Sequence, residues 1–376
     1  MSPGPQPEQP EGPAQPEQPG TRPSAMTYAA AGVDLDAAER SVTELAEVVR
    51  RTHGPEVLGG LGGFGGLFAF DAARYHQPVL VSSTDGVGTK VDLARRLQVL
   101  DTIGRDLVAM VVDDLVVTGA RPLFLNDYVS VGRLDPDRVT ALVRGIADGC
   151  ELAGCALVGG ETAEHPGLLG EDEFDLAGFG VGVVERDAIL GPHRVRPGDA
   201  LVGLASSGLH SNGYSLVRRI VEGLDLAQPH GLEAPLGAVL LEPTRIYARD
   251  CLAVGEQFDV HAWCHITGGG LPGNLPRVLP DGLSAVVDAA SWRRPAVFDW
   301  LAQRGPVADD ELWRTFNLGV GMVAVLPADQ AEAAIEWCGA RGVSAWMLGQ
   351  VVADDPHGAG QVGEPGATPG VRIVGR

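Results

Sequence analysis

Three carboxylic acids stand where a fold would bring polar groups together. Asp85 follows an apolar run at 78–84, Glu161 follows a second such run, and Asp114 lies within an apolar helical stretch. Side chains at the carboxyl ends of strands line the crevice where open sheets bind ligands. A carboxylate on an apolar face must be paired or must bind a cation, and oxygen donors suit Mg²⁺. The pattern indicates a magnesium site; the alternative is an internal ion pair for Asp114 and two ordinary turn acids.

Lys90 is the only lysine among the 28 basic residues of this 376-residue chain, and all the others are arginine. It follows Asp85 in the segment TDGVGTK. An ammonium group binds phosphate as a compact point charge, whereas a guanidinium presents a planar fork. Because arginine fills every other basic position, the composition favours a phosphate contact at Lys90 over an ordinary surface lysine.

His210 precedes Ser211 and Asn212 at the start of an amphipathic run, HSNGYSLVRRIV. An imidazole and two small polar side chains at a helix N-terminus would form an anion site. The alternative is that Ser211 or Asn212 is a plain N-cap and that His210 lies at the surface. For His265 and the loop 267–270, a structural turn is favoured over a second anion site.

The segment 59–66 is rich in glycine and matches the pattern GxGxxG. The dinucleotide-binding form of that pattern follows a strand and opens a helix, whereas this loop follows a predicted helix and enters a strand. Residues 86–90 also lack the GxxxxGK[ST] pattern of a P-loop. The remaining interpretations are a backbone that cradles phosphate and a tight connection that uses glycine.

Composition excludes several classes of protein. The formal net charge of −21 argues against binding to nucleic acid, which needs clustered cations. No apolar run approaches the ~20 residues of a membrane span. Five cysteines, an odd number without a CxxC motif, favour free thiols and a cytoplasmic location. Residues 1–26 are rich in Pro, Gln and Glu, which predicts a disordered tail rather than a signal peptide.

The periodicity predicts helices over 36–51, 103–118 and 136–153, and strands over 78–84, 155–160 and 175–186. In the second helix, Asp114 falls within the apolar stripe, while Asp113 lies at its edge beside Asp106. The pattern begins again near residue 200 with a new strand. We therefore expect an N-terminal domain over 27–195, a C-terminal domain over 196–353 and a largely flexible tail over 354–376.

Taken in order, the segments between about 27 and 352 resemble one family closely, the phosphoribosylformylglycinamidine cyclo-ligases, also called aminoimidazole ribonucleotide synthetases. The resemblance rests on YAAAGVD (28–34), PEVLGGLGGFGGLF (55–68), TDGVGTK (84–90), DTIGRDLVAM (101–110), DDLVVTGARPLF (113–124), GCALVGGETAEHPG (154–167), SSGLHSNGYSLVR (206–218), PTRIY (243–247), HITGGGLPGNLPRVLP (265–280) and FNLGVGM (316–322).

This resemblance implies an α+β fold with two α/β-sandwich-like domains per subunit. It also implies a homodimer in which the strands of the N-terminal domains join across the interface. The expected reaction belongs to de novo purine biosynthesis. ATP phosphorylates the formyl amide oxygen of formylglycinamidine ribonucleotide, an amine closes the imidazole ring, and ADP and phosphate leave. The ATP and Mg²⁺ half is shared with selenophosphate synthetase and thiamine-monophosphate kinase, which are the alternative functions.

The resemblance also implies roles for single residues. Mg²⁺ and ATP are expected at Asp85, Asp114 and Glu161. The phosphates are expected to face Gly62, Gly63, Phe64 and Gly65, together with Thr89 and Lys90, and His210, Lys90 and Asp114 are the expected catalytic residues. Two departures stand out: Ala46 occupies a position where the family usually has lysine, and Asp113 occupies one where it has asparagine.

Overall fold

The N-terminal half of the chain is built around a four-stranded sheet. The computed structural model describes residues 45–60, 63–354 and 370–376. The strand order is β3-β6-β4-β5, in which β4 and β5 are parallel and the other neighbours are antiparallel. Its strands are β3 (Pro78–Gly86), β4 (Arg121–Val131), β5 (Ala156–Glu164) and β6 (Phe174–Glu185). The strands β3 and β5 therefore lie at opposite edges of the sheet.

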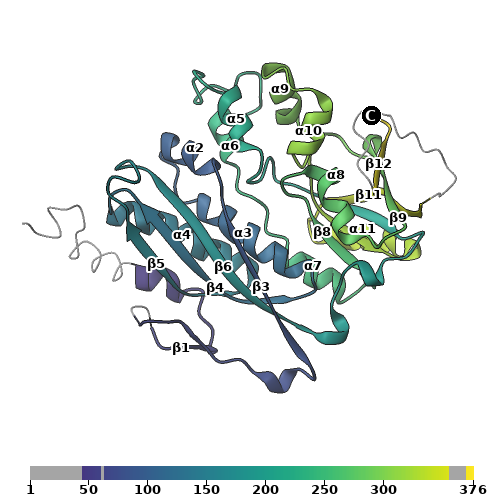
Figure 1. Cartoon of the computed structure of the whole chain (residues 1–376), viewed down its shortest axis with the longest axis horizontal. Coiled ribbons are helices and arrows are strands. Elements are labelled where there is room, and N and C mark those ends of the chain that lie inside the picture. Colours follow the sequence, from purple (N-terminus) through teal and green to yellow (C-terminus); the bar gives the residue numbers. More distant parts are fainter. Residues whose placement is uncertain (1–44, 61–62, 355–369) are drawn as a thin grey trace, which may run out of the picture.

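Helices α3 (Ile103–Val116) and α4 (Pro136–Ala153) cover one face of this sheet (Figure 1). The side chain of Asp135 accepts hydrogen bonds from the first turn of α4, and Gly154 ends the helix at φ 79°. The two helices approach closely at Gly104, where an added Cβ would overlap the backbone of α4. The helix α2 (Lys90–Leu97), a helical turn over 45–50 and the hairpin of β1 (Val57–Leu58) and β2 (Leu67–Phe68) complete this half.

The C-terminal half contains a six-stranded sheet in the order β12-β9-β11-β7-β10-β8. All neighbours are antiparallel except β12 and β9. Its strands are β7 (Ala200–Ala205), β8 (Ala262–His265), β9 (Leu283–Asp288), β10 (Val320–Leu326), β11 (Ala345–Ala353) and β12 (Val371–Val374). Every residue of β10 is buried, which agrees with its place inside the sheet.

Seven helices of the described chain accompany this second sheet. They are α5 (Tyr214–Ile220), α6 (Leu236–Leu241), α7 (Ala248–Gly255), α8 (Gly270–Asn274), α9 (Ala296–Arg304), α10 (Asp309–Thr315) and α11 (Ala331–Ala340). Short 3-10 turns are η2 (Ala72–Arg74), η3 (Arg186–Ala188), η4 (Pro192–Arg194), η5 (Leu275–Val278), η6 (Ala289–Ser291) and η7 (Ala328–Gln330). No helix of the described residues is long and apolar enough to cross a membrane.

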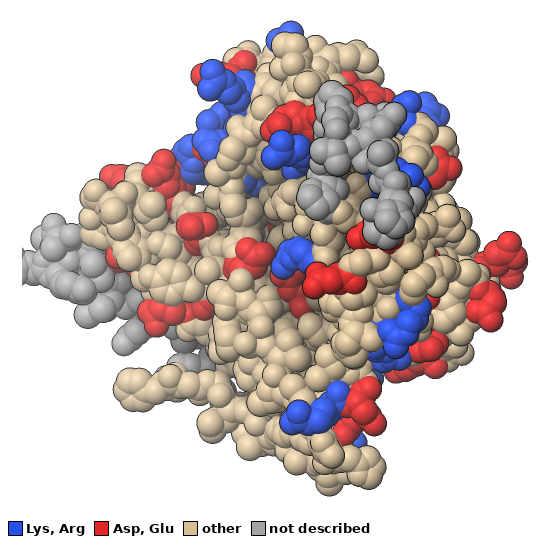
Figure 2. All heavy atoms as spheres, turned by 45° about the vertical axis from the view of Figure 1, so that its right-hand side comes forward, with Lys and Arg blue, Asp and Glu red and all other residues tan. Residues whose placement is uncertain are grey.

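The two halves share one continuous hydrophobic core, in which buried residues of both sheets and their helices are in contact. The helix α3 lies between the first sheet and the C-terminal half (Figure 1), and it contacts α7 and β8 there. Acidic and basic side chains are interspersed on the face shown in Figure 2. Packed side chains hold the two halves together, and α3 contacts both of them.

The α+β fold with two domains is confirmed, and the main helices and strands lie within a few residues of their predicted limits. All five cysteines are free and buried, as expected. The expectation of a flexible tail over 354–376 is wrong for Val371–Val374, because this β-branched run pairs in parallel with β9. The expected N-terminal tail over 1–26 and most of the helix predicted from residue 36 lie outside the described residues.

Candidate functional site

Three aspartates of α3 bond to the C-terminal domain. Asp106, Asp113 and Asp114 are spaced i, i+7 and i+8, so they lie on one side of the helix. Asp106 accepts hydrogen bonds from Thr244, Asp113 accepts one from the backbone N–H of Tyr247, and Asp114 accepts one from His265. The acids of this apolar helix therefore connect the two domains.

His265, the last residue of β8, bonds the second domain to Asp114 and interacts with the charge of Asp85, and both acids are predicted metal ligands. Its Nδ1–H donates to Asp114 Oδ1 at 3.0 Å, and its Nε2 is buried without a partner among the described residues. Burial alone would lower the pKa of His265, but the hydrogen bond to Asp114 and the charges of Asp113, Asp114 and Asp85 raise it. Burial, followed by repulsion from Asp114, raises the pKa of Asp85. Asp85, Asp114 and His265 thus act on one another electrostatically across the domain junction.

The structure corrects the expected placement of the α3 acids. Asp106 and Asp113 are fully buried, whereas the side chain of Asp114 keeps 42% of its exposure. Asp113 Oδ2 has no partner among the described residues, and burial raises the pKa of Asp113 to about 7. The periodic pattern showed only the stripe that packs on the sheet. Asp106 and Asp113 are buried by the second domain, which that pattern does not reveal.

Glu161 lies apart from Asp85 and Asp114. Asp85 shares a row with Gly178 of β6 and Asp127 of β4, so these residues face the helices. Glu161 pairs with Tyr128, one position further along, and so faces the opposite side of the sheet. It also lies three strands from Asp85, roughly 14 Å at the usual strand spacing. The expected triad of Asp85, Asp114 and Glu161 is therefore not assembled in one chain.

In the described ranges, no group of three or more His, Cys, Asp or Glu residues is arranged to hold a metal ion. The strand order explains this result. Along the chain, β4 is the only strand between β3, which carries Asp85, and β5, which carries Glu161. In the sheet, both β6 and β4 lie between these two strands. What the structure brings together instead is Asp85, Asp114 and His265, a pair of carboxylates with a histidine whose pKa they raise.

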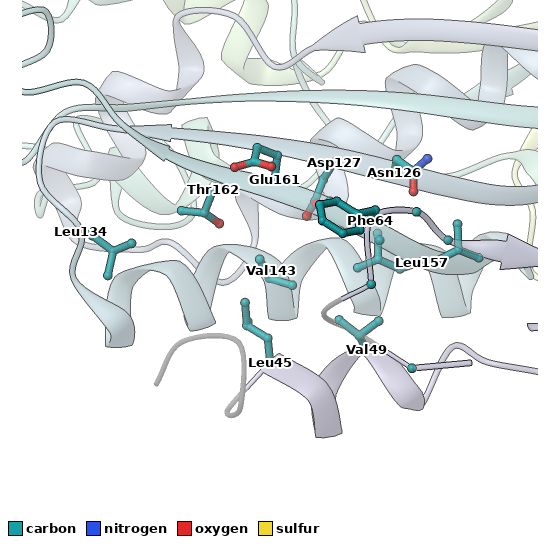
Figure 3. A pocket seen from close by; sticks show the side chains of 17 residues that line it. Leu45, Val49, Phe64, Asn126, Asp127, Leu134, Val143, Leu157, Glu161 and Thr162 are labelled. Carbon is teal, nitrogen blue, oxygen red and sulfur yellow. The ribbon is translucent and has the colours of Figure 1, made fainter. Parts of the chain in front are cut away.

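The glycine-rich loop lies over the β5 edge of the sheet and borders a pocket of about 570 Å³ (Figure 3). Gly63, Phe64 and Gly65 line this glycine-loop pocket, and Glu161 does so from β5. The side chain of Phe64 is fully exposed to solvent in the single chain. The remaining member of the predicted set, Gly62, lies outside the described residues. The loop connects β1 to β2 and is therefore not the dinucleotide-binding turn.

Thr89 lies in a different cavity. This interdomain cleft, of about 790 Å³, is lined by the α2 start and by two segments of the C-terminal domain, residues 211–216 and 305–308. The Thr89 and Ser215 hydroxyls lie 3.2 Å apart across it. The segments expected to face phosphate are therefore divided between the glycine-loop pocket and the interdomain cleft.

His210 is buried at the domain junction rather than at a helix end. The helix α5 begins at Tyr214, and neither Ser211 nor Asn212 caps it. The ring Nε2 of His210 accepts a hydrogen bond from the backbone N–H of Ser207 at 3.2 Å. Burial and the nearby cations His265 and Lys90 lower its pKa well below the usual value. The neutral ring therefore carries its proton on Nδ1, which is buried without a partner among the described residues.

The backbone of His210 is strained. Its φ is 64°, in the left-handed region that residues other than glycine rarely adopt, at a cost of roughly 1–2 kcal/mol. The ring lies against Gly321, where an added Cβ would come within 2.6 Å of His210 Cε1. A strained backbone and a fitted ring indicate that the surrounding residues hold the imidazole in one position.

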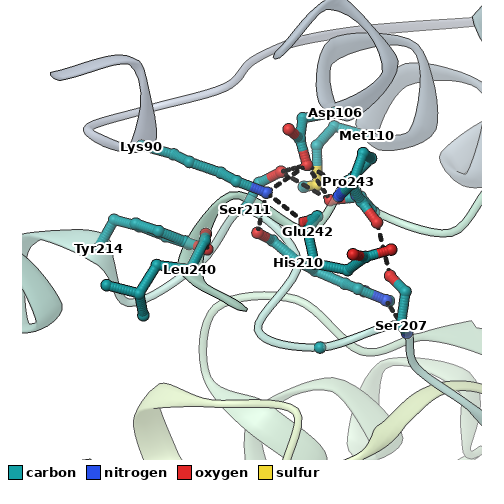
Figure 4. Close-up of polar contacts among 12 residues, drawn as sticks. Lys90, Asp106, Met110, Ser207, His210, Ser211, Tyr214, Leu240, Glu242 and Pro243 are labelled. Atoms are coloured by element: carbon teal, nitrogen blue, oxygen red, sulfur yellow. Dashed lines mark hydrogen bonds and ion pairs between the residues drawn. The ribbon is translucent and has the colours of Figure 1, made fainter. Parts of the chain in front are cut away.

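Lys90 differs from its expected role as a phosphate ligand. Its side chain is completely buried, and Nζ donates to Asp106 Oδ1 at 2.8 Å, to His210 O at 3.0 Å and to Glu242 O at 2.8 Å (Figure 4). These contacts use all three protons of the ammonium group. Burial lowers the pKa of Lys90 and the Asp106 charge opposes that effect. The expectation is wrong because the position of Lys90 in TDGVGTK does not reveal that the C-terminal domain covers its side chain.

The sequence predicted a structural turn at His265 and the following loop, and it indicated no role for His265 in the site. The loop that follows is a structural turn, as favoured: the Asn274 side-chain amide donates to the carbonyls of Thr267, Gly268 and Gly270. Asp106 was also missed. The available signal was the spacing of three acids on an otherwise apolar helix, which predicts a polar partner on that side.

Two models of known families match most of the chain. The AIR synthase related protein, N-terminal domain, matches residues 70–184, and the AIR synthase related protein, C-terminal domain, matches residues 196–360. Together they cover well over half of the sequence, in the order expected for one protein. The chain belongs to the AIR synthase related family.

Solved structures of this general fold are similar across nearly the whole chain. Thiamine-monophosphate kinase from Stenotrophomonas maltophilia is 20% identical, with a TM-score of 0.60, and the match covers 89% of this chain and 96% of the kinase. Hydrogenase maturation protein HypE in complex with ATP is 19% identical, with a TM-score of 0.61 over 84% of this chain and 86% of HypE. At these identities the similarity shows the fold.

Proposed function

We propose that this AIR synthase related protein is a phosphoribosylformylglycinamidine cyclo-ligase. It would convert formylglycinamidine ribonucleotide to 5-aminoimidazole ribonucleotide with consumption of ATP, as an enzyme of de novo purine biosynthesis in the cytoplasm. The single observation that carries the proposal is the position of His210. The segment SSGLHSNGYSLVR, which distinguishes the cyclo-ligase resemblance, places at the domain junction a neutral imidazole whose Nδ1–H has no hydrogen-bond partner among the described residues.

ATP is proposed as the co-substrate on two grounds. The chain belongs to the AIR synthase related family, and the similar structures of HypE and of AaThiL are complexes with ATP and with AMPPCP, respectively. In this chain the backbone of the glycine-loop pocket suits a polyphosphate. Because the chain has a net charge of −21, it repels anions overall, and local backbone sites of this kind are the means by which it would bind one.

The residues that fit Mg²⁺ are Asp85 and Asp114. Mg²⁺ in phosphate-transferring proteins is usually held by one or two carboxylates, with waters and phosphates completing its octahedron. Repulsion between Asp85 and Asp114 contributes to the raised pKa of Asp85, and a divalent cation between them would remove that repulsion. The ion would supply charge neutralisation for the polyphosphate.

The chain's own residues suggest how ring closure is assisted. The Nδ1–H of His210 is a donor without a partner in the part of the chain that the structure describes, so it can hold an oxygen of the substrate. Because the pKa of His210 is lowered, the ring stays neutral at physiological pH and adds no charge. The reacting amine and carbon belong to one molecule, so fixing their geometry contributes through effective molarity. His210 thus orients the formyl group in this proposal and is not the proton acceptor.

We also propose a homodimer. The open face of the N-terminal sheet exposes Leu80 (63%), Phe179 (41%) and Tyr128 (40%), one from each of three neighbouring strands. A second copy would cover these side chains.

One assay tests the reaction. The full-length protein is mixed with formylglycinamidine ribonucleotide, ATP and Mg²⁺, and ADP release and product mass are followed. We expect ADP to form only with this substrate and the product to be lighter by one water. The matched variant His210→Ala should bind ATP normally but lose cyclisation. ADP release by the wild type without a cyclised product contradicts the proposal.

The alternative is a small-molecule kinase of the same family. The observation that favours it is the match to thiamine-monophosphate kinase over 96% of that enzyme's length. The same assay with thiamine monophosphate separates the two functions. Phosphorylation of thiamine monophosphate, with no turnover of formylglycinamidine ribonucleotide, would establish the kinase.

A further inference from the structure

The buried ammonium group of Lys90, at the domain junction, uses all three of its protons in hydrogen bonds. Lys90 comes from the first residue of α2 in the N-terminal domain, and two of its three acceptors are backbone carbonyls of the C-terminal domain, those of His210 and Glu242. The ring of Tyr214 completes the enclosure, with its centroid 5.4 Å from Nζ. A phosphate could approach this group only if the domains separated.

Asp106 continues the same contacts on the N-terminal side. Its Oδ1 accepts from Lys90 at 2.8 Å, from the backbone N–H of Thr244 at 2.8 Å, from the Thr244 hydroxyl, and from Ser211 Oγ at 3.3 Å. The Ser211 and Thr244 hydroxyl oxygens also lie 2.9 Å apart, and because each hydroxyl has one proton, one of them donates either to Asp106 or to the other hydroxyl. Figure 4 shows these contacts converging around Nζ and Asp106. The Lys90–Asp106 pair therefore holds two segments of the other domain.

One of these segments carries His210. The carbonyl of His210 is bound by Lys90, and the side chain of the next residue, Ser211, is bound by Asp106. The left-handed backbone of His210 lies between these two contacts. On the other side, Ser207 fixes the ring through Nε2. The direction of the Nδ1–H bond is thus set by contacts from both domains.

Stability alone does not account for a buried ion pair, because apolar residues of similar volume are often as stabilising or more so. Geometry accounts for it better. The three protons of an ammonium group diverge, which suits one carboxylate and two carbonyls in different directions. A planar guanidinium is larger and cannot donate in this arrangement within a site that has no exposed surface. This explains why the one lysine of an arginine-using chain stands here.

We infer that Lys90, together with Asp106, is a positioning residue for His210 and is not a phosphate ligand. The inference deepens the proposed function and rests on it for the meaning of His210. The two carbonyl contacts fix the histidine loop to the N-terminal domain, so that the imidazole meets the substrate only in the docked arrangement.

The test compares the full-length wild type with variants of the Lys90–Asp106 pair and with a control variant. Lys90→Met leaves Asp106 buried without its cation and is at risk of misfolding. The double variant Lys90→Met/Asp106→Leu replaces both partners with apolar groups, and we expect it to fold. Arg96→Met is the matched control, because Arg96 is a cation of the same helix whose side chain is 46% exposed and paired with Asp92.

For the double variant we expect kcat to fall by about 100-fold through misplacement of the imidazole. The Kd for ATP with Mg²⁺, measured by calorimetry, should stay within about threefold of the wild type, since no phosphate contact is lost. The conservative variant Lys90→Arg should not restore kcat. Arg96→Met should match the wild type in both measurements. A Kd raised tenfold or more in the double variant, with the control unchanged, overturns the inference in favour of a phosphate ligand.

Nuclear magnetic resonance of ¹⁵N-labelled histidine makes the test independent of the reaction. We expect the wild type to show His210 as a single species protonated on Nδ1, and the double variant to show an averaged or shifted signal. An unchanged His210 signal overturns the inference, even if the wild type proves to be a kinase. Failure of the wild type to cyclise formylglycinamidine ribonucleotide, with the expected histidine signals, refutes only the proposed function.

Discussion

The substitution Asp113→Asn should lower the stability of the protein in acid but leave it unchanged or raise it in alkali. The carboxyl group is fully buried on α3, and Oδ1 accepts from the backbone N–H of Tyr247 at 2.9 Å. Oδ2 has no partner within the described chain. Burial raises the pKa of Asp113 from 3.8 to about 7. Because the folded state binds the proton more tightly, this group destabilises the fold increasingly as pH rises from about 4 to 7.

The magnitude follows from the two pKa values. A folded pKa of about 7 against 3.8 in the unfolded chain corresponds to a loss of about 3 kcal/mol between about pH 4.5 and about pH 8. Asparagine keeps the acceptor for Tyr247 but leaves an unpartnered amide, which costs about 1–3 kcal/mol at every pH. Asp113→Asn should therefore be less stable than the wild type in acid and as stable or more stable in alkali.

Urea unfolding of both proteins, without Mg²⁺ or nucleotide, at about pH 4.5 and about pH 8 measures this change. Asp92→Asn is the control. Burial would raise the pKa of Asp92, but the hydrogen bond from Arg95 and the charges of Arg218 and Arg96 lower it. Its stabilising effect is fully present above about pH 4, so its difference from the wild type should be constant over this range. A pH-independent difference for Asp113→Asn would refute the reasoning.

Three other substitutions test the site and the fold. Asp114→Asn should lower turnover by roughly 10–100-fold and raise the Mg²⁺ requirement while the protein stays folded; full activity at ordinary Mg²⁺ would rule out a ligand role. His265→Asn should cost stability below about pH 6.5 and progressively less as pH rises through the raised folded pKa of His265, so equal losses in urea at low and high pH would exclude the ion pair. Gly104→Ala should lower stability by about 1–3 kcal/mol through overlap with α4, whereas Gly339→Ala in α11, where the added Cβ meets nothing, should be neutral or stabilising by up to about 1 kcal/mol in the same measurement.

Local features of this fold were predictable because their causes are local. The helix α4 begins after Asp135 and Pro136 and ends at Gly154, and each of these residues acts on its own turn. Periodicity predicted α3, α4, β3, β5 and β6 and, in the second sheet, the strand near residue 200, but it did not predict β4. The run Val371–Val374 was missed because its only signal is four residues long and its partner, β9, is distant in sequence.

The candidate site was less predictable because it depends on contacts between distant segments. The positions of Asp85 and Asp114, which act on each other electrostatically, follow from the strand end and from α3. Glu161 was grouped with them because it also follows a strand and was expected at the same ligand-binding edge, whereas β6 and β4 separate β3 from β5 in the sheet. The burial of Asp106 and Asp113 depends on how the C-terminal domain docks, and no periodic pattern within one helix records that.

The two lysine positions of the family resemblance illustrate the same distinction. Ala46 stands in the helical turn 45–50, next to Leu45 of the glycine-loop pocket, and it is half-buried. Lys90 is completely buried, and all three protons of its ammonium group are used inside the domain junction. Loss of a lysine at the first position removes a charge near the glycine-loop pocket. Loss at the second removes a contact between two domains and releases the backbone of His210, so selection for a rigid junction is sufficient to retain one lysine in a chain that uses arginine elsewhere.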